Sequence, residues 1–352
     1  MPVWVPRRVL ITPSARTWAH GNAIAERAAA LGSDIVEMRT DRLTGLSNDD
    51  PRKEYVGAKT SLAIVVASPS KRRLSPIPPS ADWQFHLAEG CPAHCQYCYL
   101  AGSLSGPPVT RVYANLPEIL DGLTAYEGQG TVTSKSRARS AEGTTFECSC
   151  YTDPLGIEHL TGSLAETIRF FGLWEAPVQL RWTTKFDAVE ELLAIEHAGR
   201  TRARFSVNAA SVVRGMEGGT ANMICRLAAM GKMARAGYPI GLTIAPIMNV
   251  ENWREEYETL LRDASAALRD VPNLDLTAEL ITHRFTPSSK LVLLDWYPKT
   301  KLDLEEANRK EKRTKFGTVK YVYPADQMKE LRRFFETKLG EYLPAARILY
   351  WT

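Results

Sequence analysis

The chain has 352 residues, of which 44% are hydrophobic and 24% are charged, and this composition excludes a protein that is mostly disordered. Its net charge of +4 is compatible with a polyanionic partner but does not require one. No stretch approaches the ~20 apolar residues of a membrane span, and the first residues lack the apolar run of a signal peptide. We therefore predict a cytoplasmic protein that has no membrane partner.

The first 80 residues are predicted to form an N-terminal α/β subdomain that ends in a linker. Residues 17–31 have helical periodicity and are followed by a glycine, whereas residues 61–67 form an apolar, β-rich run. Residues 69–79 are rich in proline and basic residues, which is typical of a linker or a surface loop.

Residues 81–290 alternate between β-rich runs and helical stretches, and this alternation predicts βαβ units with a parallel sheet. The predicted strands are residues 83–88, 144–151, 178–184, 203–208, 240–245 and 274–281. The predicted helices between them are residues 163–171, 187–197, 220–236 and 253–269. Six strands are fewer than the eight of a closed barrel. We therefore expect an open, partial (β/α)6 barrel, with a doubly wound open sheet as the alternative.

Residues 291–352 are predicted to form a C-terminal segment with a basic run and a final helix over residues 326–339. The basic run, residues 308–320, carries six cations among thirteen residues, with aromatic residues between them. Lys and Arg neutralise phosphates, so the run is a candidate for DNA contact. A Phe-Gly step could form a turn between two extended arms. The alternative is an exposed, charged helix face, since Glu305, Glu306 and Glu311 lie nearby.

Three of the six cysteines, Cys91, Cys95 and Cys98, lie within eight residues in the pattern CxxxCxxC. This clustering does not fit a secreted disulfide framework. The motif follows the first strand of the βα series, where barrel enzymes place active-site loops. Three thiolates can hold three irons of a cubane cluster and leave the fourth iron open for a small molecule. A zinc site is the alternative, but His94 or a distant cysteine would have to complete it.

CxxxCxxC with an aromatic residue before its third cysteine resembles the motif of the radical S-adenosylmethionine superfamily. The resemblance covers roughly residues 83–285. It implies a [4Fe-4S] cluster on Cys91, Cys95 and Cys98, with S-adenosyl-L-methionine bound to the open iron. It also implies a partial (β/α)6 barrel and an electron donor such as flavodoxin or ferredoxin.

A second stretch, residues 147–160, has the sequence ECSCYTDPLGIEHL and follows the second predicted strand. Together with Lys185 and residues 238–247, 283–290 and 315–323, it is similar to the spore photoproduct lyase family. This similarity runs from about residue 81 to the C-terminus. It implies a DNA-repair lyase that acts on UV-damaged DNA containing a thymine dimer, the spore photoproduct 5-thyminyl-5,6-dihydrothymine, and returns two thymines.

The family resemblance assigns roles to individual residues. Cys150 aligns with the catalytic cysteine that donates a hydrogen atom, and Tyr97 and Tyr99 match two tyrosines proposed to relay hydrogen to the resulting thiyl radical. The residues expected to contact the cofactor are Tyr97, Thr152, Lys185, Ser206 and the backbone of Ala245. In the basic hairpin, Arg313 and Lys315 are expected to contact DNA phosphates. Further candidate DNA contacts are Lys71, Arg72, Arg73, Lys135, Arg137 and Arg139.

Some alternatives remain open at this point. Cys150 could be a buried core cysteine, because a free cysteine packs as a small hydrophobe. Strand alternation would place Cys148 on the same face as Cys150 and make it a helper or a decoy. The chain could also be a radical enzyme with another nucleic-acid or peptide substrate, or a metal-stabilised nucleic-acid binder without catalysis.

Overall fold

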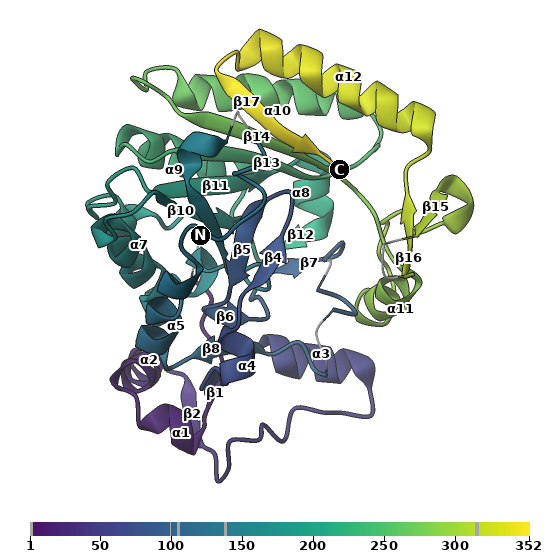
Figure 1. Ribbon diagram of the computed structural model, residues 1–352. Helices are drawn as coiled ribbons and strands as arrows, with labels where there is room; N and C mark the ends of the chain where they lie inside the picture. Colours follow the sequence, from purple (N-terminus) through teal and green to yellow (C-terminus); the bar gives the residue numbers. More distant parts are fainter. Residues whose placement is uncertain (1–2, 99, 104–105, 137–138, 314–316) are drawn as a thin grey trace. The chain divides into compact units, whose positions relative to one another are not determined.

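The structure is a computed structural model that describes the chain except residues 1–2, 99, 104–105, 137–138 and 314–316 (Figure 1). It contains two compact units that interleave along the sequence. Unit 1 comprises residues 1–92, 105–184 and 188–203, and unit 2 comprises residues 93–104, 185–187 and 204–352. The three-part division predicted from the sequence, with limits at residues 80 and 290, stays a prediction.

The main sheet has eight strands in the described part of the chain, and the limit between the two units falls within β11. In spatial order the strands are β4 (Ser75–Ile77), β5 (Ala81–Phe85), β9 (Thr144–Cys148), β10 (Val178–Thr184), β11 (Thr201–Val207), β13 (Ile240–Ile247), β14 (Leu276–Thr282) and β17 (Ala346–Trp351). The pairs β5–β9 and β9–β10 in unit 1, and β13–β14 and β14–β17 in unit 2, are parallel.

The six strands predicted from the sequence correspond to β5, β9, β10, β11, β13 and β14, which are consecutive in this sheet. The two edge strands were not predicted. β4 lies in the stretch predicted as a linker and pairs antiparallel with β5, and β17 follows the last helix. Residues 69–79 are therefore partly an edge strand, a position where proline is tolerated because one side of the strand needs no hydrogen-bond donor.

Helices α7 (Ser163–Leu173), α9 (Met223–Arg235) and α10 (Trp253–Leu268) confirm three of the four predicted barrel helices. The helix predicted over residues 187–197 is wrong, since only a 3-10 turn at Glu190–Leu192 forms there. Val189, Leu192 and Ile195 are buried and recur at every third residue. This spacing fits a 3-10 turn as well as an α-helix, so the periodicity alone could not separate them.

The last helix, α12 (Ala325–Tyr342), is three residues longer than predicted at its C-terminal end. Leu331, Phe335 and Leu339 recur at every fourth residue and are buried, so they form one apolar face. This face packs on α10 and β17, with the Phe335 and Tyr257 ring centroids 5.0 Å apart.

A second sheet in unit 1 has the order β2 (Asp34–Glu37), β1 (Arg8–Ile11), β3 (Ser61–Val65), β8 (Thr110–Tyr113) and β6 (Ala88–Glu89). Helix α2 (Ala19–Ala30) packs its buried Ile24, Ala25 and Ala28 against this sheet. Both α2 and β3 confirm the elements predicted for the first 80 residues. The shorter helices of unit 1 are α1 (Pro13–Arg16), α3 (Pro51–Lys59), α4 (Pro69–Arg72), α5 (Leu116–Asp121) and α6 (Glu158–Thr161).

The predicted pair of extended arms in the basic run is confirmed as an antiparallel hairpin, with β15 (Lys310–Arg313) paired to β16 (Val319–Val322) (Figure 1). The base of the hairpin is fixed by two backbone hydrogen bonds between Phe285 and Tyr321. The remaining short elements of unit 2 are β7 (His94–Cys95), α8 (Ala210–Met216), β12 (Glu217–Gly218) and α11 (Pro287–Trp296). No helix in the described ranges is both long and apolar enough to cross a membrane.

Arg309, the first cation of the basic run, is buried and anchors the hairpin. Its guanidinium carbon lies 4.0 Å from the ring centroid of Tyr323, and its Nη1 donates to the carbonyl of His283 at 3.3 Å. Burial, together with the nearby Arg309 charge, lowers the pKa of His283 to about 3. His283 is therefore neutral in the folded chain at neutral pH.

Acidification is expected to destabilise the folded chain through His283. The unfolded chain binds a proton at this residue near pH 6.5, whereas the folded chain does so only near pH 3, so stability is lost as the pH falls between these values. Between pH 7 and pH 4 the loss from this one group is about 3 kcal/mol. Denaturant unfolding of wild type and His283→Asn at both pH values measures it. An equal loss in the two proteins would contradict the assignment.

Candidate active site

In unit 1, the loops that follow β5 and β9 leave the sheet at the same edge, because Phe85 lies opposite Cys148 in a parallel pair. The first loop leads to Cys91 and the second carries Cys150. Ser149 joins them: its N–H donates to the carbonyl of Phe85 at 2.7 Å, and its hydroxyl accepts from the N–H of Leu87 at 3.0 Å. The carboxyl ends of parallel strands are where α/β barrels place their active sites.

Cys148 and Cys150 do not share an environment, so the expectation that strand alternation places them on one face is wrong. The strand ends at Cys148, and Ser149 has a left-handed backbone with φ of 57°, which interrupts the alternation. Cys148 is 1% exposed and lies on the strand face of Phe146, whose ring packs on Phe171 of α7. Burial raises the pKa of its thiol to about 12. Cys148 is therefore a packing residue.

Cys150 is half-buried, and the side chains of Tyr151 and Asp153, which follow it, each contact a neighbouring strand or loop. The ring of Tyr151 stacks on His86, with the centroids 4.6 Å apart. The hydroxyl of Thr184, at the end of β10, donates to Asp153 at 2.8 Å. The hydroxyl oxygen of Thr152 is buried and has no hydrogen-bond partner among the described residues. An orphaned buried hydroxyl is costly and is consistent with a ligand contact at this residue.

The three cysteines of the motif form no disulfide and are half-buried. Cys91 belongs to unit 1, and its carbonyl accepts a hydrogen bond from Lys59, whereas Cys95 and Cys98 belong to unit 2. Among the described residues, no group of three Cys, His, Asp or Glu side chains is gathered to hold a metal ion. The donor set itself, three accessible thiols on one loop, suits an iron–sulfur cluster. The cluster site stays a prediction.

In unit 2, the cysteine loop is held by the segment that contains α8 and β12. The short strand β7 pairs with β12, so that Cys95 lies opposite Glu217 (Figure 1). Gln96 adds a backbone hydrogen bond to the carbonyl of Met216 at 2.8 Å. Its side chain donates to Gly215 at 3.1 Å and accepts from the hydroxyl of Thr300 at 2.6 Å. The part of the cysteine loop that lies in unit 2 is therefore held by β12, by the end of α8 and by Thr300.

Tyr97 is hydrogen-bonded to a buried ion pair. Its hydroxyl donates to Oε1 of Glu217, and Oε2 of Glu217 lies 2.5 Å from Nη2 of Arg226. The side chains of Glu217 and Arg226 are both 0% exposed. Burial, reinforced by the Glu217 charge, raises the pKa of the Tyr97 phenol well above its ordinary value. Tyr97 therefore keeps its hydrogen at any physiological pH.

Three of the predicted cofactor residues, Lys185, Ser206 and Ala245, lie together in unit 2. The ammonium group of Lys185 donates to the hydroxyl of Ser206 at 2.5 Å, and that hydroxyl lies 3.4 Å from the carbonyl of Ala245. The Lys185 ammonium is also 5.8 Å from the ring centroid of Tyr97. The structure thus brings Tyr97, Lys185, Ser206 and Ala245 into one network.

Sequence reasoning missed Glu217 and Arg226, which connect this network. Arg226 donates to the carbonyls of Ser206 at 3.0 Å and Ala221 at 2.8 Å, and to the hydroxyl of Thr220 at 2.7 Å. One signal was present: Arg226 occupies the apolar face of α9, in register with the buried Met230 and Met233. A charge on the buried face of a helix requires a partner, but the sequence does not name it.

The predicted DNA contacts have different environments. Arg313, on β15, is 74% exposed and pairs with Glu311 at 3.3 Å. Lys315 and Tyr99, and also Arg137, lie outside the described residues. Among the further candidates, Arg139 is wrong because it is 5% exposed and forms a buried ion pair with Glu142 at 2.9 Å. Lys71 and Arg72 are tied to Glu89 and Glu118.

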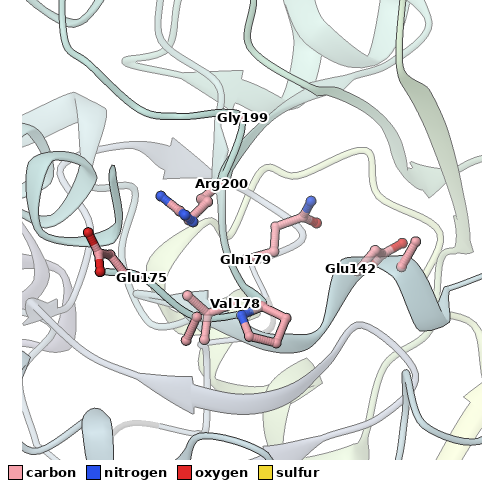
Figure 2. Close-up of a pocket in the computed structure, with 9 residues that line it drawn as sticks. Glu142, Glu175, Val178, Gln179, Gly199 and Arg200 are labelled. Atoms are coloured by element: carbon pink, nitrogen blue, oxygen red, sulfur yellow. The ribbon is translucent and has the colours of Figure 1, made fainter. Parts of the chain in front are cut away.

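A hollow of about 480 Å³ in unit 1 is lined by none of the predicted site residues. Figure 2 shows the side chains that line it. Its lining includes Glu142, Val178 and Arg200, which lie at the amino ends of β9, β10 and β11. The predicted catalytic residue Cys150 follows the carboxyl end of β9. This hollow therefore contains none of the residues predicted to act in catalysis.

A family model described as "Spore photoproduct lyase" matches residues 4–352. The chain belongs to the spore photoproduct lyase family. It is 37% identical over 353 residues to spore photoproduct lyase from Geobacillus sp. (strain Y412MC61), with 100% of both chains covered. It is also 37% identical over 350 residues to spore photoproduct lyase from Bacillus subtilis (strain 168), with 99% of each covered.

Two solved structures extend the similarity to the fold of the spore photoproduct lyase family. One is a mutant spore photoproduct lyase with bound AdoMet and dinucleoside spore photoproduct, and the other is the lyase complexed with dinucleoside spore photoproduct. Each is 36% identical, covers 100% of both chains and has a TM-score of 0.90. These matches confirm the predicted open α/β barrel and the predicted family.

The environments of Cys148 and Cys150 predict different reactivity towards an alkylating reagent. At pH 8 a thiol with a pKa of about 12 is ionised in about one molecule in ten thousand, and Cys148 is also shielded from solvent. Iodoacetamide should therefore label the native, cluster-free chain at Cys150 and leave Cys148 unmodified, as read by tandem mass spectrometry. Cys150→Ala serves as the control. Labelling of Cys148 in the native chain would contradict its assignment to the core.

Proposed function

We propose that this chain reverses the spore photoproduct in ultraviolet-damaged DNA to two thymines. The observation that carries the proposal is similarity along the whole chain: 37% identity to curated spore photoproduct lyases and a TM-score of 0.90 to one that holds AdoMet and dinucleoside spore photoproduct. Identity at this level across 100% of both chains supports a shared substrate class.

Cys91, Cys95 and Cys98 are proposed to hold a [4Fe-4S] cluster that leaves one iron open for S-adenosyl-L-methionine. The three residues form no disulfide and are half-buried, and thiolates are the usual ligands of such clusters. The reduced cluster and its cofactor would supply a 5′-deoxyadenosyl radical that removes a hydrogen atom from C6 of the lesion. The reducing electron is proposed to come from a donor such as flavodoxin or ferredoxin.

Five residues are proposed to contact the cofactor: Tyr97, Thr152, Lys185, Ser206 and the backbone of Ala245. In unit 2, the Lys185 ammonium can pair with the cofactor carboxylate, and the Ser206 hydroxyl can exchange its contact with Lys185 for a polar group of the cofactor. In unit 1, the orphaned Thr152 hydroxyl gains a partner when a ligand binds.

Cys150 is proposed to donate a hydrogen atom to the thymine radical that remains after the bridge between the bases breaks. Its S–H bond breaks, a C–H bond forms on the base, and the sulfur becomes a thiyl radical. Tyr97 and Tyr99 are then proposed to return a hydrogen atom to the sulfur. Cys150 follows β9 and is only half-buried, which suits this step, whereas Cys148 is buried in the core.

The β15–β16 hairpin is proposed to contact the DNA backbone through Arg313 and Lys315. Lys312 lies opposite Lys320 in the hairpin, and directly opposed like charges are destabilising without an anion nearby. Burial and the charges of Arg284 and Lys312 lower the pKa of Lys320, which shows that cations crowd here. Phosphates would relieve this repulsion.

Repair of a spore-photoproduct dinucleotide tests the function. The anaerobically reconstituted and reduced chain should release thymine from it. Cys150→Ala should still cleave the cofactor but form aberrant products, because the thymine radical finds no hydrogen donor. The matched control, Cys148→Ala, should give normal products, since Cys148 only packs. Chromatography with mass spectrometry identifies the products. A fully clustered wild-type chain that releases no thymine would overturn the proposal.

The hairpin assignment predicts a difference between two substrates. Arg313→Ala should weaken binding to a duplex that contains the lesion and reduce the slope of log K against log salt by about 0.9, the value for one phosphate contact. Repair of the dinucleotide should be unchanged, because it lacks flanking phosphates. Arg169→Ala, an exposed cation on α7, is the matched control. An unchanged salt slope for Arg313→Ala would remove this residue from the interface.

A further inference from the structure

The hydrogen bond from Tyr97 to Glu217 has a role that the proposed function leaves open. A tyrosine hydroxyl can donate to water or to a backbone carbonyl, so a buried carboxylate is an unusual acceptor. In this chain the acceptor is Glu217, which has no exposed side-chain surface and faces Arg226 at 2.5 Å. Burying a charge pair costs desolvation free energy, which good geometry and additional hydrogen bonds to both partners must offset.

Arg226 is held rigidly, because its donors are distributed over several acceptors. Nε donates to Ala221, Nη1 donates to the carbonyl of Ser206, and Nη2 donates to Thr220 and faces Glu217. Two of these acceptors are backbone carbonyls, which do not rotate. The guanidinium therefore has a single position, and it fixes the carboxylate that it pairs with.

Glu217 is also fixed from its own backbone, because it lies in β12 opposite Cys95 in β7. Tyr97 follows Cys95 by two residues, so the same short pairing positions both ends of the hydrogen bond. The phenol oxygen consequently has its place set by the Glu217–Arg226 pair and by the backbone pairing together. The Lys185 ammonium, 5.8 Å from the ring centroid, lies over the face of the same ring.

We propose that Glu217, held by Arg226, is a positioning residue that fixes the Tyr97 phenol, the group proposed to return a hydrogen atom to the Cys150 thiyl radical. The inference rests on the proposed function, in which Tyr97 restores the Cys150 thiol. In that step the hydrogen bond from Tyr97 to Glu217 opens, the O–H bond of Tyr97 breaks and the S–H bond of Cys150 forms. One proton and one electron move together, the thiyl radical becomes a thiol and Tyr97 becomes a neutral phenoxyl radical.

Orientation matters here because Tyr97 is also proposed to lie at the cofactor. A phenol O–H bond is weaker than an aliphatic C–H bond, so a misplaced phenol can quench the adenosyl radical before it reaches the lesion. An anionic acceptor binds the hydroxyl about twice as strongly as a neutral one, so it keeps the phenol in place and its hydrogen bound to the carboxylate until the transfer. Loss of Glu217 should therefore increase the amount of S-adenosylmethionine consumed per lesion repaired, because some adenosyl radicals form without leading to repair.

The number of S-adenosylmethionine molecules consumed per dinucleotide repaired measures this effect. Glu217→Gln keeps the size and an acceptor oxygen but removes the charge, and it should raise the ratio at least twofold. Tyr97→Phe should raise it further. The Tyr97→Phe/Glu217→Gln double variant should match Tyr97→Phe alone, because Glu217 acts through the Tyr97 hydroxyl. A purely structural role would instead give multiplied effects.

A matched control uses a second tyrosine–glutamate pair of this chain. Tyr113 is hydrogen-bonded to Glu89, a buried carboxylate that pairs with Lys71 at 2.6 Å. Tyr113→Phe should leave the ratio unchanged. Denaturation of the cluster-free variants adds a measurement that needs no activity: Glu217→Gln should lower the unfolding midpoint less in a Tyr97→Phe background than in the wild type, since the hydrogen bond is already absent there.

The outcomes separate the inference from the function on which it rests. A wild-type chain that repairs no dinucleotide contradicts the proposed function. A wild-type chain that repairs, with an unchanged ratio in Glu217→Gln or in Tyr97→Phe, overturns the positioning role. Multiplied effects in the double variant also overturn it. If Glu217→Gln folds poorly, the apolar pair Glu217→Leu/Arg226→Leu replaces it in the same cycle, with the same expected result.

Discussion

The buried ion pair between Glu217 and Arg226 is the interaction on which the site in unit 2 depends. Removing one partner from a buried pair costs about 3–5 kcal/mol, because it leaves an uncompensated charge. Through this pair the cysteine loop, by way of Tyr97, is connected to the carbonyl of Ser206 on β11. Ser206 in turn contacts Lys185 and Ala245. The predicted cofactor residues of this unit are therefore one connected structure.

Parallel strands give the site its location in each unit. In unit 1, the pairing of Phe85 with Cys148 brings the two loops that carry Cys91 and Cys150 to the same edge. In unit 2, Ser206 and Ala245 occupy the carboxyl ends of β11 and β13. Cys150, the proposed hydrogen-atom donor, is half-buried just after the edge in unit 1, whereas Cys148 is 1% exposed.

The sequence predicted the central strands well because each contains several β-branched or aromatic residues, even where the run is not apolar, as in β11 with its sequence TRARFSV. It missed β4, which is short and contains Pro76, and β17, which lies beyond the predicted last helix. It placed Cys148 on the same face as Cys150 because alternation assumes an unbroken strand, whereas β9 ends at Cys148 and Ser149 is left-handed. The pairing of Glu217 with Tyr97 depends on β12 folding back onto β7, a contact between residues about 120 positions apart that no local pattern encodes.

The most direct test of the account is electron–nuclear double resonance on the reduced, anaerobically reconstituted chain with S-adenosylmethionine labelled with ¹⁵N in its amino group. A cluster held by Cys91, Cys95 and Cys98 would leave one iron open, so we expect a ¹⁵N coupling in a single reduced [4Fe-4S] cluster per chain. A colourless protein with one bound zinc ion, or a cluster without any ¹⁵N coupling, would contradict it.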